Sequence, residues 1–259
     1  MNYETFKIQV LDLTGINLSA YKENQMKRRI DAIVKKNQCN NYSEYIILLK
    51  SNASSLQEFV TYLTINVTEF FRNPSQWDIL EKQIFPLLLQ KKRQIKIWSA
   101  ACSTGDEPYS LAMVLSKFMP LNQINIIATD LDKEVLEKAR AGQYIGRSIA
   151  NVPKEFQEKY FTENKGIYSI RPNLKECITF KQHNLLKDPY PSSIDLIVCR
   201  NVLIYFTEEA KKQIYTNFNR ALADDGILFV GSTEQIIMCQ DYGFESYKIF
   251  FYQKAGLKR

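Results

Sequence analysis

The spacing of apolar residues changes once along the chain, and this change limits the fold to two parts. Up to about residue 75, apolar residues recur every three or four positions, as on one face of a helix, in segments 5–20, 24–36, 43–51 and 55–65. From Ile95 onward, short apolar runs alternate with amphipathic stretches, as in an α/β sheet. The sequence therefore predicts an all-α domain over residues 1–75 and an α/β domain over residues 76–259.

Several short runs have the composition of strands. Four are apolar enough for a parallel sheet covered on both faces: Ile95–Ala100, Ile124–Thr129, Asp195–Cys199 and Ile227–Gly231. A last run, Phe244–Gln253, has no room for a following helix, so we expect an added antiparallel strand. Two further runs, Gly166–Arg171 and Cys177–Lys181, predict a small β insertion at about 160–182. The predicted fold class is a Rossmann-like α/β domain preceded by a small helical domain.

Histidine and cysteine usage excludes two kinds of active site. The chain has a single histidine, His183, and five scattered cysteines without a C-x-x-C pair, so a zinc site or a Ser-His-Asp triad has too few residues. The first residues carry an early acid and lack the long apolar run that is typical of a secretory signal peptide. No later run approaches the roughly 18 apolar residues that span a bilayer. We expect a cytoplasmic protein without direct membrane insertion, most simply a monomer.

The loop after the first predicted strand carries two acids next to a lone glycine. In open α/β sheets, ligands lie beyond the carboxyl ends of the strands. Gly105 alone does not make a pyrophosphate-binding G-x-G-x-x-G, and Asp106 and Glu107 would repel phosphate. The loop therefore predicts a cofactor without phosphate, and S-adenosylmethionine fits because its sulfonium and ammonium groups can pair with acids. Whether Asp106 or Glu107 makes the main contact stays open.

A further acid ends the second predicted strand. Asp130 follows Gly105 by about 25 residues, near the place where an acid binds ribose hydroxyls in such sheets. An aspartate at a strand end can also cap the next helix. Asp132 suits that role better because it directly precedes the helical run Lys133 to Ala141.

One predicted helix, residues 22–36, carries a basic face. At 100° per residue, five cations cluster on an arc that excludes Glu23 and Asp31: Lys22, Arg28, Arg29, Lys35 and Lys36. Such a face is either a solvated helix surface or a docking surface for an acidic partner. The net charge of +6 is too modest to favour nucleic acid on its own.

Five motifs follow one another along the chain. They are N-x-T-x-F-F-R at 66–72, W-S-A-A-C-S-T-G-x-E-P-Y-S at 98–110, A-T-D-x-D at 128–132, H-N-L at 183–185 and C-R-N-V-x-I-Y-F at 199–206. In this order they closely resemble the CheR family of chemoreceptor glutamate O-methyltransferases, and the match covers nearly the whole chain.

The resemblance implies roles for individual residues. Those in contact with S-adenosylmethionine, whose product is S-adenosylhomocysteine, would be Asn66, Thr68, Arg72, Glu107, Asp130, Asn184, Leu185, Arg200 and Asn201. Arg72 and Tyr205 would face the reacting methyl group. The family usually has a glutamate where this chain has Asp106. The basic face would dock the glutamate-bearing methylation helices of chemoreceptors, and some family members bind a receptor-tail peptide at the β insertion.

Two other functions fit parts of the pattern. A nucleic-acid methyltransferase could use the basic helix to bind phosphates. Methyltransferases that act on amino groups carry a D-P-P-Y motif at the end of the fourth strand. Here Lys187-Asp188-Pro189-Tyr190 lacks one of the two prolines and precedes that strand. A sensor that binds S-adenosylmethionine without catalysis would not need both Arg72 and Tyr205. These two residues could instead form an interdomain salt bridge and a packing contact, respectively.

Overall fold

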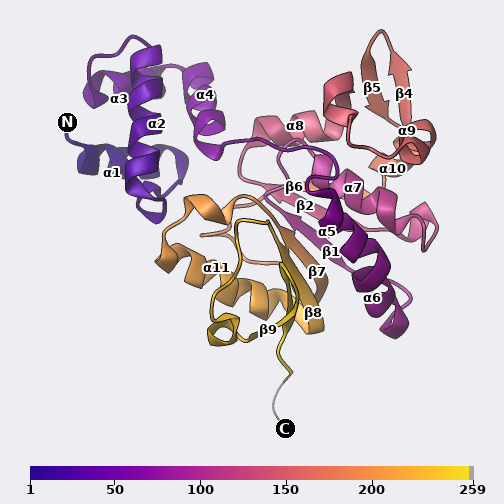
Figure 1. The fold of residues 1–259 in the computed structure, drawn as a ribbon. Helices are drawn as coiled ribbons and strands as arrows, with labels where there is room; N and C mark the ends of the chain where they lie inside the picture. Colours follow the sequence, from indigo (N-terminus) through magenta and orange to yellow (C-terminus); the bar gives the residue numbers. More distant parts are fainter. Residues whose placement is uncertain (257–259) are drawn as a thin grey trace. The chain divides into compact units, whose positions relative to one another are not determined.

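The computed structural model describes residues 1–256, and the chain forms two compact units (Figure 1). The first unit contains Met1–Asn66 together with Leu203–Gln213, and the second contains Val67–Val202 and the chain from Ile214 onward. A membrane-crossing helix, which would have to be long and apolar, is not found within residues 1–256.

The first unit is built from helices. They are α1 (Tyr3–Thr14), η1 (Leu18–Ala20), α2 (Glu23–Lys36), α3 (Tyr42–Ser51), α4 (Ala53–Thr64) and η5 (Leu203–Tyr205). Asparagine side chains cap α1, α3 and α4 by accepting a backbone N–H of the first turn. Phe6, Tyr45 and Phe59 are fully buried at their centre, where each large apolar side chain contributes about 1.5–3 kcal/mol.

The second unit is organised around a seven-stranded sheet of order β6-β2-β1-β7-β8-β10-β9. Its strands are β1 (Ile97–Ala100), β2 (Ile126–Asp130), β6 (Ile178–Gln182), β7 (Ile194–Cys199), β8 (Leu222–Val230), β9 (Phe244–Lys248) and β10 (Phe251–Lys254). The first five in spatial order are parallel, and β10 and β9 are antiparallel to their neighbours. The antiparallel addition expected at the chain end is confirmed, although the run Phe244–Gln253 folds as a hairpin instead of one strand.

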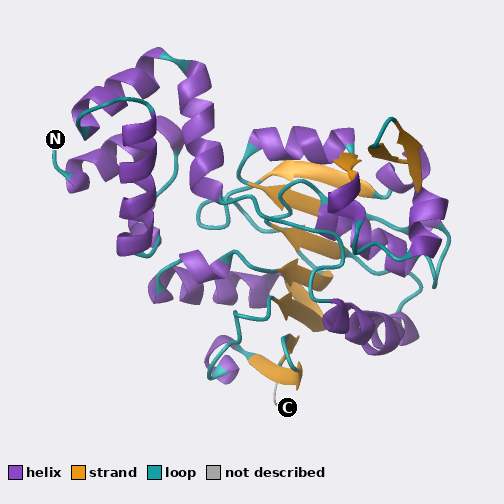
Figure 2. Ribbon diagram, turned by 45° about the horizontal axis from the view of Figure 1, so that its top comes forward, coloured by secondary structure: helices purple, strands orange, loops and turns teal. Residues whose placement is uncertain are grey.

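Helices lie on both sides of this sheet (Figure 2). The remaining helices of the chain are α5 (Pro74–Ile79), η2 (Leu80–Ile84, a π-helical turn), α6 (Phe85–Lys91), α7 (Asp106–Leu115), η3 (Leu121–Gln123), α8 (Lys133–Ala141), η4 (Gly146–Ile149), α9 (Lys154–Tyr160), α10 (Pro172–Lys175), α11 (Glu208–Ala221) and η6 (Cys239–Tyr242). Of these, η4 and α9 pack on the smaller β insertion, and residues 208–213 of α11 belong to the first unit. Asp132 caps α8 by accepting the N–H of Glu134 at 2.9 Å, as its position in the sequence predicts.

Alternate residues of the parallel strands fill the two faces of the sheet. Ile97 stands in register with Ile126 on one side and Leu196 on the other, and all three are fully buried in the main core. The next residue, Trp98, points to the opposite face, where its ring meets Phe218 of α11 at 5.5 Å. This double covering explains the continuous apolar runs of the central strands.

The β insertion differs in part from its prediction. It is an antiparallel sheet of order β3-β5-β4, formed by Gln143–Ile145, Ile167–Ile170 and Phe161–Asn164. The run Cys177–Lys181 is not part of it, because Ile178–Gln182 pairs in parallel with β2 as an outer strand of the main sheet. Residues 143–145, which the sequence pattern did not single out, supply the third strand instead.

Candidate active site

The loop between β1 and α7, residues 101–105, has a strained backbone. Ala101, Ser103 and Gly105 all have positive φ, of 64°, 49° and 91°. A Cβ on Gly105 would lie 3.0 Å from the Cβ of Ala139, so this position needs glycine for space as well as for conformation. Non-glycine residues in this region of φ cost free energy and concentrate at functional sites. We call residues 101–105 the cofactor loop.

Asp130 ties the cofactor loop to the end of β2. Its carboxylate accepts the N–H of Ser103 at 2.8 Å and the N–H of Asp132 at 3.0 Å. The N–H of Cys102 also bonds to the carbonyl of Thr129 at 2.9 Å. Burial raises the pKa of Asp130 to about 6, against the opposing effect of its amide donors. The sequence proposed Asp130 for the ribose, and the structure adds that it holds the loop.

Glu107 lies in the first turn of α7 and is buried with polar partners. Its carboxylate accepts the hydroxyl of Ser99 at 2.8 Å and lies 3.6 Å from Nη1 of Arg200. Burial raises the pKa of Glu107, and the positive charge of Arg200 and the Ser99 hydroxyl oppose this effect. An acid at the N-terminus of a helix is also favoured by the helix dipole.

Asp106 adds a second buried acid at the start of the same helix. It accepts the hydroxyl of Thr104 at 2.6 Å, and burial raises its pKa to about 6. Asp106, Glu107 and Asp130 thus give the carboxyl end of the sheet three buried carboxyl groups. Burying so many acids is costly unless a cation is bound nearby.

Arg200 connects β7 to the segment that precedes α5. Its side chain is 2% exposed, and Nη2 donates to the carbonyl of Arg72 and to Oε1 of Gln76, both at 2.7 Å. The guanidinium also lies over the ring of Phe229 at 4.8 Å. Arg200 therefore has a structural role in addition to its proposed contact with the cofactor.

The other predicted cofactor residues occupy several segments. Asn184 caps a turn by accepting the N–H of Leu186 at 2.9 Å, and Leu185 is buried. Asn66 belongs to the first unit, where its amide donates to Thr64 at 2.8 Å. Thr68 belongs to the second unit and is half-buried.

The two predicted catalytic residues belong to different units. Arg72 is half-buried in the second unit, where Nη1 donates to the carbonyl of Val67 at 3.3 Å. Tyr205 ends η5 in the first unit and is half-buried. Their joint action on a methyl group stays a prediction.

Glu234 is a residue that the sequence reasoning missed. Its buried carboxylate accepts the N–H of Asn201, which has a φ of 61°, and the N–H of Gly231 at 2.9 Å. Glu234 thereby joins the chain after β7 to the chain after β8, next to Arg200. A lone acid in a loop carries no pattern, so only the fold could have revealed it.

The five residues of the predicted basic face have different surroundings. Lys22, Arg28 and Lys35 are exposed. Arg29 is half-buried, with its guanidinium over the ring of Tyr62 at 4.5 Å and a hydrogen bond to the Tyr62 carbonyl. Lys36 forms an ion pair of 2.6 Å with Glu58. Arg29 is therefore bound to Tyr62 of α4, and Lys36 is paired with Glu58 of the same helix. We retain the other three, Lys22, Arg28 and Lys35, as the basic patch.

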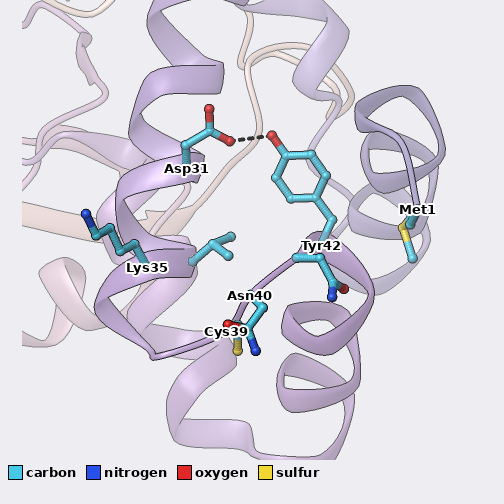
Figure 3. Close-up of a pocket in the computed structure, with 8 residues that line it drawn as sticks. Met1, Asp31, Lys35, Cys39, Asn40 and Tyr42 are labelled. Atoms are coloured by element: carbon cyan, nitrogen blue, oxygen red, sulfur yellow. Dashed lines mark hydrogen bonds between the residues drawn. The ribbon is translucent and has the colours of Figure 1, made fainter.

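A cavity of about 440 Å³ lies beside Lys35 in the first unit. Asp31, Cys39 and Tyr42 contribute to its walls, and the hydroxyl of Tyr42 points to the carboxylate of Asp31 (Figure 3). Asp31 also pairs with Lys27 at 3.0 Å, and burial raises the pKa of the Cys39 thiol. The cavity therefore offers no activated nucleophile.

The residues of the second unit fit S-adenosylmethionine by their chemistry. The buried acids Asp106 and Glu107 suit its two cationic groups, and Asp130 suits its ribose hydroxyls. The hydroxyl of Ser103 is buried without a partner among residues 1–256. Fold and site thus define an S-adenosylmethionine-dependent methyltransferase, and the matched families agree: the model described as "CheR methyltransferase, SAM binding domain" matches residues 66–250, and "CheR methyltransferase, all-alpha domain" matches residues 1–64.

The chain belongs to the CheR methyltransferase family. It is 44% identical over 242 residues to a chemotaxis protein methyltransferase of Listeria monocytogenes, and the aligned region covers 93% of this chain and 92% of the relative. Relatives with the same description are 36% identical in Borreliella burgdorferi, covering 86% and 83% of the two chains, and 35% identical in Escherichia coli, covering 85% and 79%.

Proposed function

We propose that this protein transfers the methyl group of S-adenosylmethionine to glutamate side chains of methyl-accepting chemoreceptors in the cytoplasm. The products would be glutamyl methyl esters and S-adenosylhomocysteine, as chemotactic adaptation requires. The observation that carries the proposal is the attachment of the Tyr205 segment to the start of the basic helix α2. A helical substrate docked on α2 would thereby lie on the same unit as a candidate catalytic side chain.

The attachment includes three contacts within the first unit. The N–H of Lys22 donates to the carbonyl of Tyr205 at 2.9 Å, and the N–H of Thr207 donates to the carbonyl of Ala20 at 2.8 Å. The rings of Tyr21 and Phe206 stack at 4.7 Å. The position of Tyr205 relative to the basic patch is therefore fixed by backbone bonds and an aromatic pair instead of by a flexible loop.

The basic patch suits a receptor helix that bears glutamates. Lys22, the N-cap residue of α2, and Arg28 and Lys35 within α2 are exposed, so they can meet acidic side chains of a partner helix. Because these cations are exposed, such a contact would be transient and would weaken with added salt. We propose no role for them in binding nucleic acid, since no basic, aromatic-rich stretch accompanies them.

The chemistry needs little acid or base assistance. A glutamate side chain has a pKa of about 4.3 and is already ionised at neutral pH, so it can attack a methyl group without a general base. S-adenosylmethionine supplies an activated methyl group on a sulfonium. Arg72 would hold the attacking carboxylate and Tyr205 would donate one hydrogen bond to it, and both would orient it for an in-line approach.

The experiment measures transfer of radiolabelled methyl from S-adenosylmethionine to purified cytoplasmic receptor fragments. Label released as methanol by mild alkali identifies a carboxyl methyl ester. We expect Arg72→Ala to abolish transfer and Arg140→Ala, which alters an exposed arginine of α8, to leave it intact. Alkali-stable label on an RNA control would refute the proposal, as would tight cofactor binding without transfer to any receptor fragment.

A matched pair tests the basic patch. Lys35→Glu should weaken binding of the receptor fragment and remove part of its salt dependence, because a docking cation is replaced by an acid. Lys138→Glu makes the same change at an exposed position of α8 and should have no effect. Equal effects of the two changes would refute the docking role of α2.

A further inference from the structure

The three-stranded sheet reaches the cofactor loop through one side chain. Tyr144 is the middle residue of β3 and is 7% exposed, whereas its neighbours Gln143 and Ile145 are exposed. In a strand, alternate side chains point to opposite faces, so Tyr144 alone of the three turns inward. Its hydroxyl donates to the carbonyl of Thr104 at 2.7 Å.

An aromatic cluster fixes the ring of Tyr144. Phe70 meets it edge-on with ring centroids 4.8 Å apart, and Phe70 also meets Phe161 of β4 at 5.7 Å. All three rings are buried. Since an edge-on pair in a packed core restricts both rings, the hydroxyl of Tyr144 is held in place before it meets the loop.

The bond reaches the loop at its strained part. Thr104 lies between Ser103 and Gly105, both of which have positive φ. A strained turn persists only when surrounding contacts hold it. Asp130 holds it from the main sheet through the N–H of Ser103, and Tyr144 holds it from the three-stranded sheet through the carbonyl of Thr104.

We propose that Tyr144 is a positioning residue for S-adenosylmethionine, through which the three-stranded sheet keeps the cofactor loop in its binding conformation. The proposal rests on the assignment of the cofactor to this loop. Loss of the hydroxyl removes the tie from the three-stranded sheet, while the bonds from Asp130 and Thr129 of the main sheet remain, and it lowers the fraction of molecules whose loop can bind. The apparent affinity falls in proportion to that fraction.

The test compares Tyr144→Phe with the unchanged protein in binding of S-adenosylhomocysteine by titration calorimetry. Only the hydroxyl is lost, so we expect a dissociation constant about two- to tenfold higher, as for one hydrogen bond. Hydrogen exchange at the amides of residues 101–106 should become faster. The rate of methyl transfer at saturating cofactor should change little, because the loop is then held by the ligand.

Tyr160→Phe is the matched control. Tyr160 is also buried, at 1% exposure, and its hydroxyl donates to Ser116 at the same distance of 2.7 Å, but not to the cofactor loop. Both variants should lose similar stability, and only Tyr144→Phe should lose affinity. Unchanged affinity and exchange in Tyr144→Phe, or equal losses in both variants, would overturn the proposal. An unchanged protein that fails to bind S-adenosylhomocysteine would instead refute the proposed function on which it rests.

Discussion

The buried acids at the cofactor loop predict an unusual dependence of stability on pH. Burial raises the pKa of both Asp106 and Asp130 from 3.8 to about 6. Because the folded state holds these protons more tightly than the unfolded state, protonation favours folding. The resulting stability is fully present below pH 4 and is lost as the pH rises through about 6. The second unit should therefore be more stable at pH 5 than at pH 7.5.

The magnitude follows from the two shifts. One pKa unit corresponds to about 1.4 kcal/mol, so a shift of about two units is worth about 3 kcal/mol per carboxyl at low pH. About half of this is present at pH 5, which gives a gain of about 1.4 kcal/mol per group and about 3 kcal/mol for Asp106 and Asp130 together. Replacement by asparagine, which does not titrate, removes that gain.

Urea unfolding followed by tryptophan fluorescence measures the effect. Trp77 and Trp98, the only two tryptophans, are both buried in the second unit, so their emission reports on that unit. We expect Asp106→Asn to reduce the gain in unfolding free energy between pH 7.5 and pH 5 by about 1.4 kcal/mol. Asp12→Asn, an exposed change in α1, controls for the altered net charge. A gain in Asp106→Asn as large as in the unchanged protein would refute the reasoning.

The other predictions concern the cofactor loop, Glu234 and the basic helix. Gly105→Ala should lower stability by about 1–3 kcal/mol in thermal unfolding and weaken cofactor binding, since its φ of 91° and its Cβ contact with Ala139 are both unfavourable. Glu234→Ala should cost about 2–4 kcal/mol in urea unfolding because one buried and one partly buried N–H group lose their acceptor, whereas Glu234→Gln should recover much of this loss. Arg29→Ala should lower the melting temperature, and Lys35→Ala should lower receptor binding at unchanged melting temperature.

The sequence predicted the central strands well for a physical reason. β1 and β7 are buried on both faces, so they appear as continuous apolar runs, and Asp195–Cys199 differs from the observed strand by one residue at its start. β6 lies at the outer position of the sheet and is mostly exposed, which leaves only a weak strand pattern. The strand that β6 pairs with, β2, lies far away in the sequence, so the local sequence pattern placed β6 in the β insertion instead of in the main sheet.

The candidate site was predictable only in part. Asp106 and Glu107 come after the loop that follows β1, and Asp130 ends β2, so the rule that ligands bind at carboxyl ends of strands is enough to propose them as cofactor contacts. By contrast, the structural bonds of Arg200 and Arg29 depend on residues distant in sequence, such as Gln76 and Tyr62. Helical periodicity placed Arg29 on the basic face but could not show that α4 covers it.

The carboxylates of Asp130 and Glu107 make structural bonds and can still accept a bond from a cofactor. Asp130 uses its two oxygens for two backbone N–H groups, and Glu107 uses its two for Ser99 and Arg200. Each ionised carboxylate has about four acceptor positions, so each retains room for a further partner. A cationic cofactor can therefore be bound without breaking the bonds that shape the loop, but only while these acids are ionised. Because the pKa of Asp130 is about 6, cofactor affinity should fall as the pH drops through that value, while stability rises.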